Sequence, residues 1–250
     1  MRIYLPILRD FKMLPARKEF WMCGRFAQVI KYDQLQKMEH ELRLKITSEQ
    51  IEISYNVAPT NTVMAVVPKG ELRYPGFFRW GLIPSWMKEI PKNALINIRK
   101  ETITEKPSFK ASFIRRRAII PANGFFEWLA QDKQPFFIRA SGSDLIYMAA
   151  IYDTWESADG SYLPSIGIIT QEANAFMSSL HHRMPVILQK DQIDAYLDYS
   201  NQDPRLLIHL LPDLPEDYLT AYPVSRDVNK VGNNSPHLIE PMDTIEEIFM

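Results

Sequence analysis

The feature that most constrains the fold is a series of short segments rich in β-branched and aromatic residues, separated by Pro, Gly, Asn and Asp. Segments of this composition are typical of strands. They are TVMAVV from Thr62, GFFRW from Gly76, RAIIP from Arg117, PFFIRA from Pro135, LIYMAAIY from Leu145 and SIGIIT from Ser165. Because regular helices do not alternate with them, the pattern predicts an α+β fold around a curved, largely antiparallel sheet instead of repeated βαβ units.

Helical patterns are few. Apolar residues recur at helical spacing from Tyr32 to Lys45, which predicts an amphipathic surface helix. Two weaker helical patterns lie near 171–180 and 191–199. With 250 residues, 46% of them hydrophobic, and with no internal repeat or low-complexity linker, the chain is expected to form one domain after Cys23.

The charge balance excludes no class of binding partner. There are 29 basic and 30 acidic residues, a net charge of -1, which neither indicates nor excludes a local basic groove for nucleic acid. No apolar run approaches the roughly 20 residues of a membrane helix. The opening MRIYLPILRDFK is not a convincing signal peptide, because Pro6, Arg9 and Asp10 interrupt its apolar patch. Residues Met1 to Trp21 carry five basic and two acidic side chains and are expected to be an appendage.

The single cysteine, Cys23, lies in the stretch WMCGRFA directly after Met22. One cysteine cannot form an internal disulfide, which fits a reducing cytosol. A lone free cysteine is commonly a small buried hydrophobe. If Met22 is a start methionine that is removed, however, Cys23 becomes the first residue and carries an α-amine next to its thiol. Both groups have ordinary pKa values near neutrality, and such an aminothiol condenses with an aldehyde to a thiazolidine.

Three further stretches carry candidate groups for chemistry. In PANGFFEW, Glu127 is either an acid/base group whose pKa is raised by apolar neighbours or a residue of a half-exposed strand that points to water. In SSLHHRMPVIL, His181 or His182 is either a proton shuttle or an ordinary structural histidine. Adjacent histidines cannot easily chelate one ion, so no metal site is expected.

The stretch LINIRKET alternates polar and apolar residues. A strand here would place Asn97, Arg99 and Glu101 on one face. That face would hold a sugar hydroxyl and a phosphate, or it would simply be solvated.

Several motifs occur together in an order that resembles the SRAP family, the SOS response-associated peptidases or abasic-site processing proteins. The likeness runs from Cys23 to about Pro241. The motifs are CGRFA, YNVAP, WGLIPSW, INIRKET, GFFEW, KQPFFI, LHHRMPVIL and VSRDVNKVGNNSPHLIEP.

The resemblance implies a single SRAP-like domain with a barrel-like, mainly antiparallel core and flanking helices. It also implies binding to single-stranded DNA at an abasic site and a thiazolidine crosslink that shields the lesion during the SOS response. By position, Cys23 matches the crosslinking nucleophile and Asn97 the asparagine that orients the sugar. Glu127 matches the acid/base glutamate, and His181 matches the histidine that assists sugar ring opening.

The resemblance further implies a DNA path and a cellular setting. Arginines on such a path would neutralise phosphates, and tryptophans would stack on bases, although core packing is the alternative for both tryptophans. No organic cofactor or metal is implied, and the protein is expected to be a monomer in the bacterial cytoplasm, at the nucleoid during damage. The residues on the path are Arg25, Asn56, Trp80, Trp86, Arg99, Thr170 and Arg183.

Two departures from the family pattern are notable. Residues 1–22 would block the aminothiol unless they are a propeptide or a misassigned start. The expected boundaries are therefore an extension over 1–22, an SRAP domain over 23–241 and a tail over 242–250. The family's usual His-Asp-Arg is here His181-His182-Arg183, so a carboxylate that would alter the pH response of His181 is missing.

Two other functions remain open. A cysteine hydrolase or autopeptidase would use Cys23, His181 and Glu127 as nucleophile, base and orienting group. Lyase chemistry through an imine is a related possibility. A non-catalytic single-strand binder would use the arginines and tryptophans alone, and it would be indifferent to the lesion and to Cys23.

Overall fold

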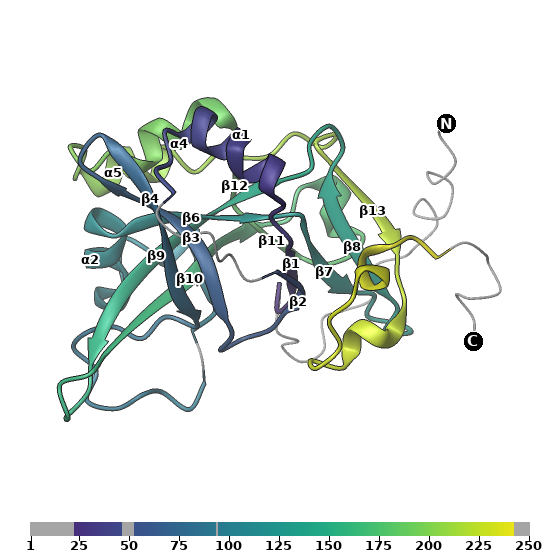
Figure 1. The fold of residues 1–250 in the computed structure, drawn as a ribbon, viewed down its shortest axis with the longest axis horizontal. Coiled ribbons are helices and arrows are strands. Elements are labelled where there is room, and N and C mark those ends of the chain that lie inside the picture. Colours follow the sequence, from purple (N-terminus) through teal and green to yellow (C-terminus); the bar gives the residue numbers. More distant parts are fainter. Residues whose placement is uncertain (1–22, 47–52, 94, 243–250) are drawn as a thin grey trace.

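The strands form two sheets in the computed structural model, which describes residues 23–46, 53–93 and 95–242 (Figure 1). The extension 1–22, and residues 243–250 of the expected tail, lie outside the described residues. The strands are β1 Phe26–Gln28, β2 Ser54–Val57, β3 Thr62–Lys69, β4 Leu72–Trp80, β5 Asn97–Arg99, β6 Arg117–Ala122, β7 Gly124–Trp128, β8 Pro135–Ala140, β9 Ile146–Glu156, β10 Tyr162–Glu172, β11 Arg183–Pro185, β12 Ile187–Leu188 and β13 Leu219–Pro223.

The larger sheet closes on itself. Its strands pair in the order β10, β4, β3, β6, β9 and back to β10, which makes a five-stranded ring. The β4–β10 pairing is parallel and the other pairings of the ring are antiparallel. The far half of β10 extends beyond the ring, where it pairs with β5 and β11. The smaller sheet is antiparallel, in the order β13-β8-β7-β1-β2.

Helices cover the ring. Figure 1 shows α1, α4 and α5 together above it. Apolar residues of α1, α2 and α4 pack in one buried cluster with residues of the ring strands, among them Ile119 of β6. The helices are α1 Tyr32–Leu42, α2 Pro107–Arg115, α3 Ala175–Ser178, α4 Lys190–Leu197 and α5 Pro204–His209, with 3-10 turns η1 Lys100–Thr102, η2 Arg226–Asn229 and η3 Pro236–Ile239.

A second buried cluster joins the two sheets. It combines Ile120 and Trp80 from the ring with Phe26 and Phe125 from the smaller sheet, and it includes Cys23. Ile119 and Ile120 belong to different clusters because neighbouring side chains of a strand point to opposite faces. A third, smaller cluster covers the other face of the smaller sheet with residues of the C-terminal segment.

The expected fold class, α+β with a curved, mainly antiparallel, barrel-like core and flanking helices, is confirmed. The six predicted strands and the helices near 32–45 and 191–199 are present. The first helix ends early, at Leu42, where Arg43 adopts a left-handed backbone conformation and caps it. No helix among the described residues is long and apolar enough to cross a membrane.

One local prediction is confirmed only in part, and another is wrong. Helix was expected near 171–180, but β10 continues to Glu172 and α3 covers four residues after the cap residue Asn174. The strand expected to include Glu101 ends at Arg99, where the pairing with Thr170 of β10 stops, and Glu101 lies in the turn η1.

Candidate functional site

Cys23 and Glu127 meet where the chain enters strand β1, beside the inner strand β7 of the smaller sheet. The backbone N–H of Cys23 donates a hydrogen bond of 2.7 Å to Oε1 of Glu127. Both residues are buried, with Cys23 at 0% and Glu127 at 3% exposure. Cys23 has a φ of 43°, in the left-handed region that residues other than glycine rarely adopt. Cys23 therefore stands in a strained backbone with a carboxyl group at its nitrogen.

Strand β7 positions the Glu127 carboxyl group next to Cys23. Phe125 belongs to the cluster that contains Cys23, whereas Phe126 belongs to the third cluster on the opposite face. Alternation then returns Glu127 to the face of Phe125. Strand β1 pairs with β7 through Phe26 and Phe125, which brings the residues before β1 close to Glu127. The alternative that Glu127 points to water is thereby excluded.

The surroundings change the acidity of both groups. Burial raises the pKa of the Glu127 carboxyl to about 8, although the hydrogen bond from Cys23 lowers it. Burial and, second, the charge of Glu127 raise the pKa of the Cys23 thiol well above its usual range. At neutral pH Glu127 is mostly protonated and can give up a proton, and the thiol needs a base before it can attack.

His181 lies in the turn between α3 and β11. The backbone N–H of Arg183 donates a 3.1 Å hydrogen bond to Nδ1 of His181, so this nitrogen must be an acceptor. A neutral ring then carries its proton on Nε2. Burial, followed by the neighbouring His182, lowers the pKa of His181 to about 4, so the ring is neutral at neutral pH.

Asn97 and His181 flank the cluster that contains Cys23. Asn97 opens β5 and faces Ile168 of β10. The residues just before them, Ile96 and Leu180, both belong to that cluster. The structure thus places the residues before Asn97 and His181 in the same buried cluster as Cys23. The side chain that bonds to Cys23 itself is Glu127.

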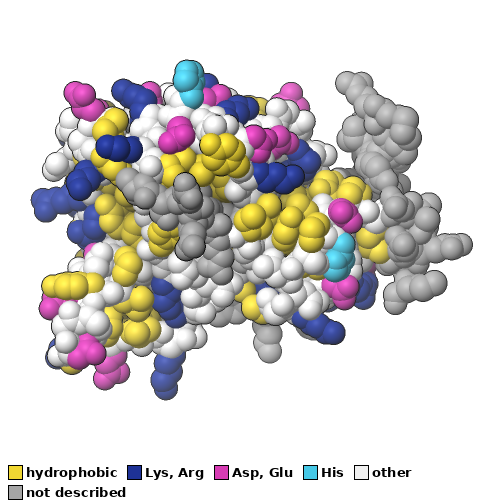
Figure 2. All heavy atoms as spheres, in the orientation of Figure 1, with side chains coloured by type: hydrophobic (Ala, Val, Ile, Leu, Met, Phe, Trp, Pro, Cys, Tyr) yellow, Lys and Arg dark blue, Asp and Glu magenta, His cyan; other side chains and the backbone are white. Residues whose placement is uncertain are grey.

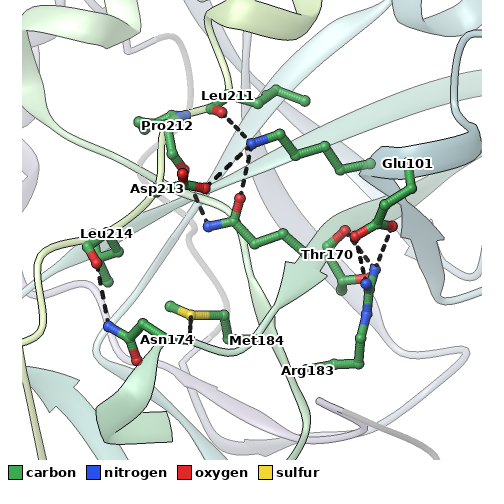
Figure 3. A network of polar contacts seen from close by, with 11 residues as sticks. Glu101, Thr170, Asn174, Arg183, Met184, Leu211, Pro212, Asp213 and Leu214 are labelled. Atoms are coloured by element: carbon green, nitrogen blue, oxygen red, sulfur yellow. Dashed lines mark hydrogen bonds and ion pairs between the residues drawn. The ribbon is translucent and has the colours of Figure 1, made fainter. Parts of the chain in front are cut away.

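Arg183 is buried at 5% exposure and paired (Figure 3). Its Nη1 donates to Oε1 of Glu101 at 2.5 Å, and its Nη2 donates to Oε2 at 2.9 Å and to the carbonyl oxygen of Thr170 at 2.8 Å. Thr170 is itself fully buried. By contrast, Arg99 is exposed at the end of β5.

Arg25 and Asn56 hold the C-terminal segment in place. The Nη1 of Arg25 donates to Oδ1 of Asn56 and to the carbonyl oxygen of Val228, at 2.8 and 2.7 Å. The Nδ2 of the buried Asn56 donates to the carbonyl oxygens of Val228, Lys230 and Asn233. These two residues therefore fix the segment 228–233 beside β2 and the residues that precede β1.

The two tryptophans expected on the DNA path differ. Trp80 is fully buried, donates from Nε1 to the carbonyl oxygen of Ile96, and packs edge-on against Phe26. The expectation that Trp80 stacks on a base conflicts with this burial, because no face of its ring is open. Trp86 is 64% exposed in the loop between β4 and β5 and can present its ring to a ligand.

Two features of the site were missed in the sequence. Glu101 was placed on the polar face of a strand, but its partner Arg183 is 82 residues away and no local pattern links them. Trp128 follows Glu127, and its Nε1 donates at 2.7 Å to Oδ1 of Asn229 in the C-terminal segment. In the sequence, only the motif GFFEW pointed to Trp128, and nothing in it indicated the contact with Asn229. Among the described residues no group of three or more potential ligands is arranged for a metal ion.

Comparisons with known proteins find one family model and several similar sequences. The sequence model of the SOS response associated peptidase (SRAP) family matches residues 22–231. The chain is 38% identical over 223 residues to the abasic site processing protein YoqW of Bacillus subtilis (strain 168), covering 88% of this chain and 99% of that protein. It is 37% identical over 204 residues to the abasic site processing protein HMCES of Rattus norvegicus, covering 67% of this chain and 56% of that protein.

Two solved structures share the fold. A protein from Bacteroides thetaiotaomicron superimposes with a TM-score of 0.76 at 24% identity, over 88% of this chain and 100% of that chain. A protein from Bordetella bronchiseptica superimposes with a TM-score of 0.69 at 21% identity, over 81% of this chain and 100% of that chain.

Proposed function

Because this chain belongs to the SOS response-associated peptidase (SRAP) family, with relatives that are abasic site processing proteins, we propose that it crosslinks itself to abasic sites in single-stranded DNA. The crosslink is a thiazolidine between Cys23 and the aldehyde of the ring-opened sugar, and it shields the lesion. The observation that supports this most is the 2.7 Å hydrogen bond between the nitrogen of Cys23 and Glu127.

The chemistry needs Cys23 as the first residue, so that its nitrogen is an amine. The amine adds to the aldehyde carbon to give a carbinolamine. Protonated Glu127 gives its proton to the hydroxyl group, which leaves as water, and the C–N bond becomes an iminium. The sulfur then adds to the same carbon while the thiol proton passes to ionised Glu127, which restores the acid and closes the ring. A carboxyl pKa of about 8 suits both transfers.

His181 and Asn97 are proposed to act on the sugar. A neutral imidazole with its proton on Nε2 can donate a hydrogen bond to the ring oxygen as that oxygen takes up charge during opening. Asn97, at the start of β5, would orient the sugar hydroxyls. Exposed Arg99 and Trp86 would contact a phosphate and a base, whereas Arg25, Asn56, Thr170 and Arg183 would shape the path.

Residues 1–22 must be absent from the active protein. We propose that they are either an untranslated stretch before Met22 or a propeptide. The strained φ of 43° at Cys23, together with Glu127 beside the nitrogen of the Met22–Cys23 peptide bond, favours self-cleavage as one route. Attack of the thiol on the Met22 carbonyl would form a C–S bond and break the C–N bond, giving a thioester. Glu127 would give its proton to the departing nitrogen and take up the proton of the thiol, and water would then hydrolyse the thioester, which releases the extension with a carboxyl end and restores the thiol.

A general cysteine hydrolase is a weaker alternative. It needs Glu127 to orient His181 and His181 to contact the thiol. Instead, Glu127 accepts from Cys23 N and His181 Nδ1 accepts from Arg183 N. The proposed setting is a monomer in the bacterial cytoplasm that joins the nucleoid during damage. Sedimentation tests the monomer, and imaging of a fluorescent fusion tests the location.

The decisive experiment starts the chain at Met22 and confirms the loss of Met22 by intact mass. The protein is incubated with single-stranded DNA that contains one abasic site, next to the full-length chain and to Cys23→Ser and Cys23→Ala variants. We expect a heat-stable adduct for the free Cys23 form. Cys23→Ser keeps the amine, so it should give an adduct after borohydride reduction and no heat-stable adduct without it.

The outcomes separate the candidate functions. An adduct on DNA without the lesion, or a heat-stable adduct that Cys23→Ala forms without borohydride, contradicts the proposal. Equal binding to intact and abasic DNA without any adduct indicates the non-catalytic binder. Peptide hydrolysis by the full-length chain without DNA indicates the hydrolase.

A further inference from the structure

Glu101 has no role in the proposed chemistry, yet it makes the most extensive ion pair near the site. Both of its carboxylate oxygens accept hydrogen bonds from the two Nη atoms of buried Arg183 (Figure 3). Such a two-pronged pair fixes the direction of the guanidinium as well as its position. The carbonyl oxygen of Thr170 accepts a third hydrogen bond from Arg183 at 2.8 Å. The Arg183 side chain is therefore held from two sides.

The turn that carries Glu101 is itself anchored. Its neighbour Lys100 donates from Nζ to the carbonyl oxygen of Leu211 at 2.6 Å and to Oε1 of Gln171 at 3.1 Å. The Nε2 of Gln171 donates onward to the carbonyl oxygen of Pro212 at 3.0 Å. Glu101 thus presents its carboxylate from a fixed support and not from a free side chain on the surface.

Arg183 also contacts the imidazole of His181, through its backbone. Its N–H donates to Nδ1 of His181 at 3.1 Å, and its backbone pairs with Glu172 of β10. An acceptor at Nδ1 requires the proton of the neutral ring to be on Nε2. Whatever fixes Arg183 therefore also selects which ring nitrogen can donate to a substrate.

We propose that Glu101 is a positioning residue for His181. By holding the Arg183 guanidinium, it keeps the Arg183 N–H against Nδ1 and keeps the proton of the ring on Nε2. The effect on catalysis rests on the proposed function, whereas the state of the ring does not. In a merely structural ion pair, loss of Glu101 would lower stability and leave the ring unchanged.

The first test reads the ring directly. Nitrogen-15 spectra of labelled histidine, recorded near neutral pH on the free protein, distinguish a protonated ring nitrogen from an acceptor one. The His181 signal is assigned by its loss in His181→Gln. We expect Nδ1 to be the acceptor and Nε2 to be protonated. A proton on Nδ1 in the unmodified protein overturns the proposal, whether or not any variant folds.

The second test uses Glu101→Gln, which removes the charge, and Glu101→Asp, which keeps it. Glu41→Gln is the matched control. Glu41 lies on helix α1, and its carboxylate forms an ion pair with Lys190 of α4. Thermal unfolding confirms that each variant is folded. We expect Glu101→Gln to give a mixed ring state and crosslinking slower by about tenfold, with little change in DNA affinity. Glu101→Asp should lie closer to the unmodified protein.

An unchanged ring state and rate in a folded Glu101→Gln protein overturns the proposal, and so does a loss of DNA affinity alone. If the unmodified protein forms no crosslink but shows the expected ring state, the proposed function fails and the structural part of the inference stands.

Discussion

The Glu127 side chain combines an acidic group with an apolar setting. Its carboxyl lies in the buried cluster around Cys23, so ionisation carries a desolvation cost that the single hydrogen bond from Cys23 does not offset. The sequence identified Glu127 and Cys23 as candidates because a carboxylate between aromatic residues and a cysteine after a methionine are both unusual. It did not reveal that they touch, since 104 residues separate them.

This burial predicts a pH-dependent stability. The folded-state pKa of Glu127 is raised, so the folded state holds its proton more tightly than the unfolded chain. The stabilisation is complete below pH 4.5 and is lost as the pH rises to about 8. Glu127→Gln removes the ionisation, so its free energy of unfolding should fall less over this range, by a difference on the order of a few kcal/mol. Urea unfolding at several pH values measures it, and parallel curves for the two proteins would contradict the prediction.

We expect a second pH effect at His181, whose pKa depends on the neighbouring residue His182. His182 lowers the pKa of His181, after burial as the larger cause. His182→Asp replaces a group that repels the imidazolium by one that attracts it, so the pKa of His181 should rise from about 4. Titration of the His181 ring protons by NMR checks this. His182→Asn, which removes the repulsion without adding a charge, should give a smaller rise. A fall in the pKa of His181 in the Asp variant would show that the packing of the ring dominates.

At the scale of elements, β7 does most to build the site. One face of it joins the cluster around Cys23 and the other face joins the C-terminal segment. The six strands predicted from composition are long enough to show their pattern, and they include all five strands of the ring. Strand β1 has three residues, too few to show an alternation, so its pairing with β7 was invisible in the sequence. The same holds for the turn η1, which follows β5 although β10 continues two residues beyond the last pair, Arg99 with Thr170.

Gly124, at the start of β7, is expected to tolerate no larger side chain without a loss of stability. A Cβ atom there would collide with the backbone carbonyl oxygen of Ile138 and lie 2.6 Å from the Phe137 ring. Gly124→Ala should therefore lower the free energy of unfolding by at least about 2 kcal/mol. Gly142→Ala is the control, because no atom lies within 4 Å of its Cβ position. Denaturant unfolding of both variants tests this, and equal stabilities would mean that β7 and β8 can separate at little cost.

At the scale of the whole molecule, no single charge sign dominates. The net charge is -1, and Figure 2 shows Lys and Arg side chains interspersed with Asp and Glu over the face in view. Composition indicated the fold class, because strands without alternating helices leave few architectures. It could not show the closure of the ring, since the parallel pairing of β4 with β10 joins segments far apart in the chain.

For the proposed DNA binding, this charge distribution predicts a dependence on a few cations. In a Cys23→Ala background, which isolates binding from crosslinking, Arg99→Gln should weaken binding to single-stranded DNA. It should also reduce the slope of log K against log salt by about 0.7, the value for one phosphate contact. Arg115→Gln removes the same charge from an exposed site on helix α2 and should leave the slope unchanged. Equal slopes for all three proteins would remove Arg99 from the DNA path.

The long separation between Cys23 and Glu127 also sets an order of events during synthesis. The ribosome makes Cys23 first and needs another 104 residues to reach Glu127, which takes roughly 5 to 20 s at ordinary rates of translation. During that interval no carboxyl stands at the cysteine nitrogen, and the strand that will carry it does not yet exist. The contact between Cys23 and Glu127 thus arises only after β7 has been made, and in the proposed function the acid that assists Cys23 arrives well after Cys23 itself.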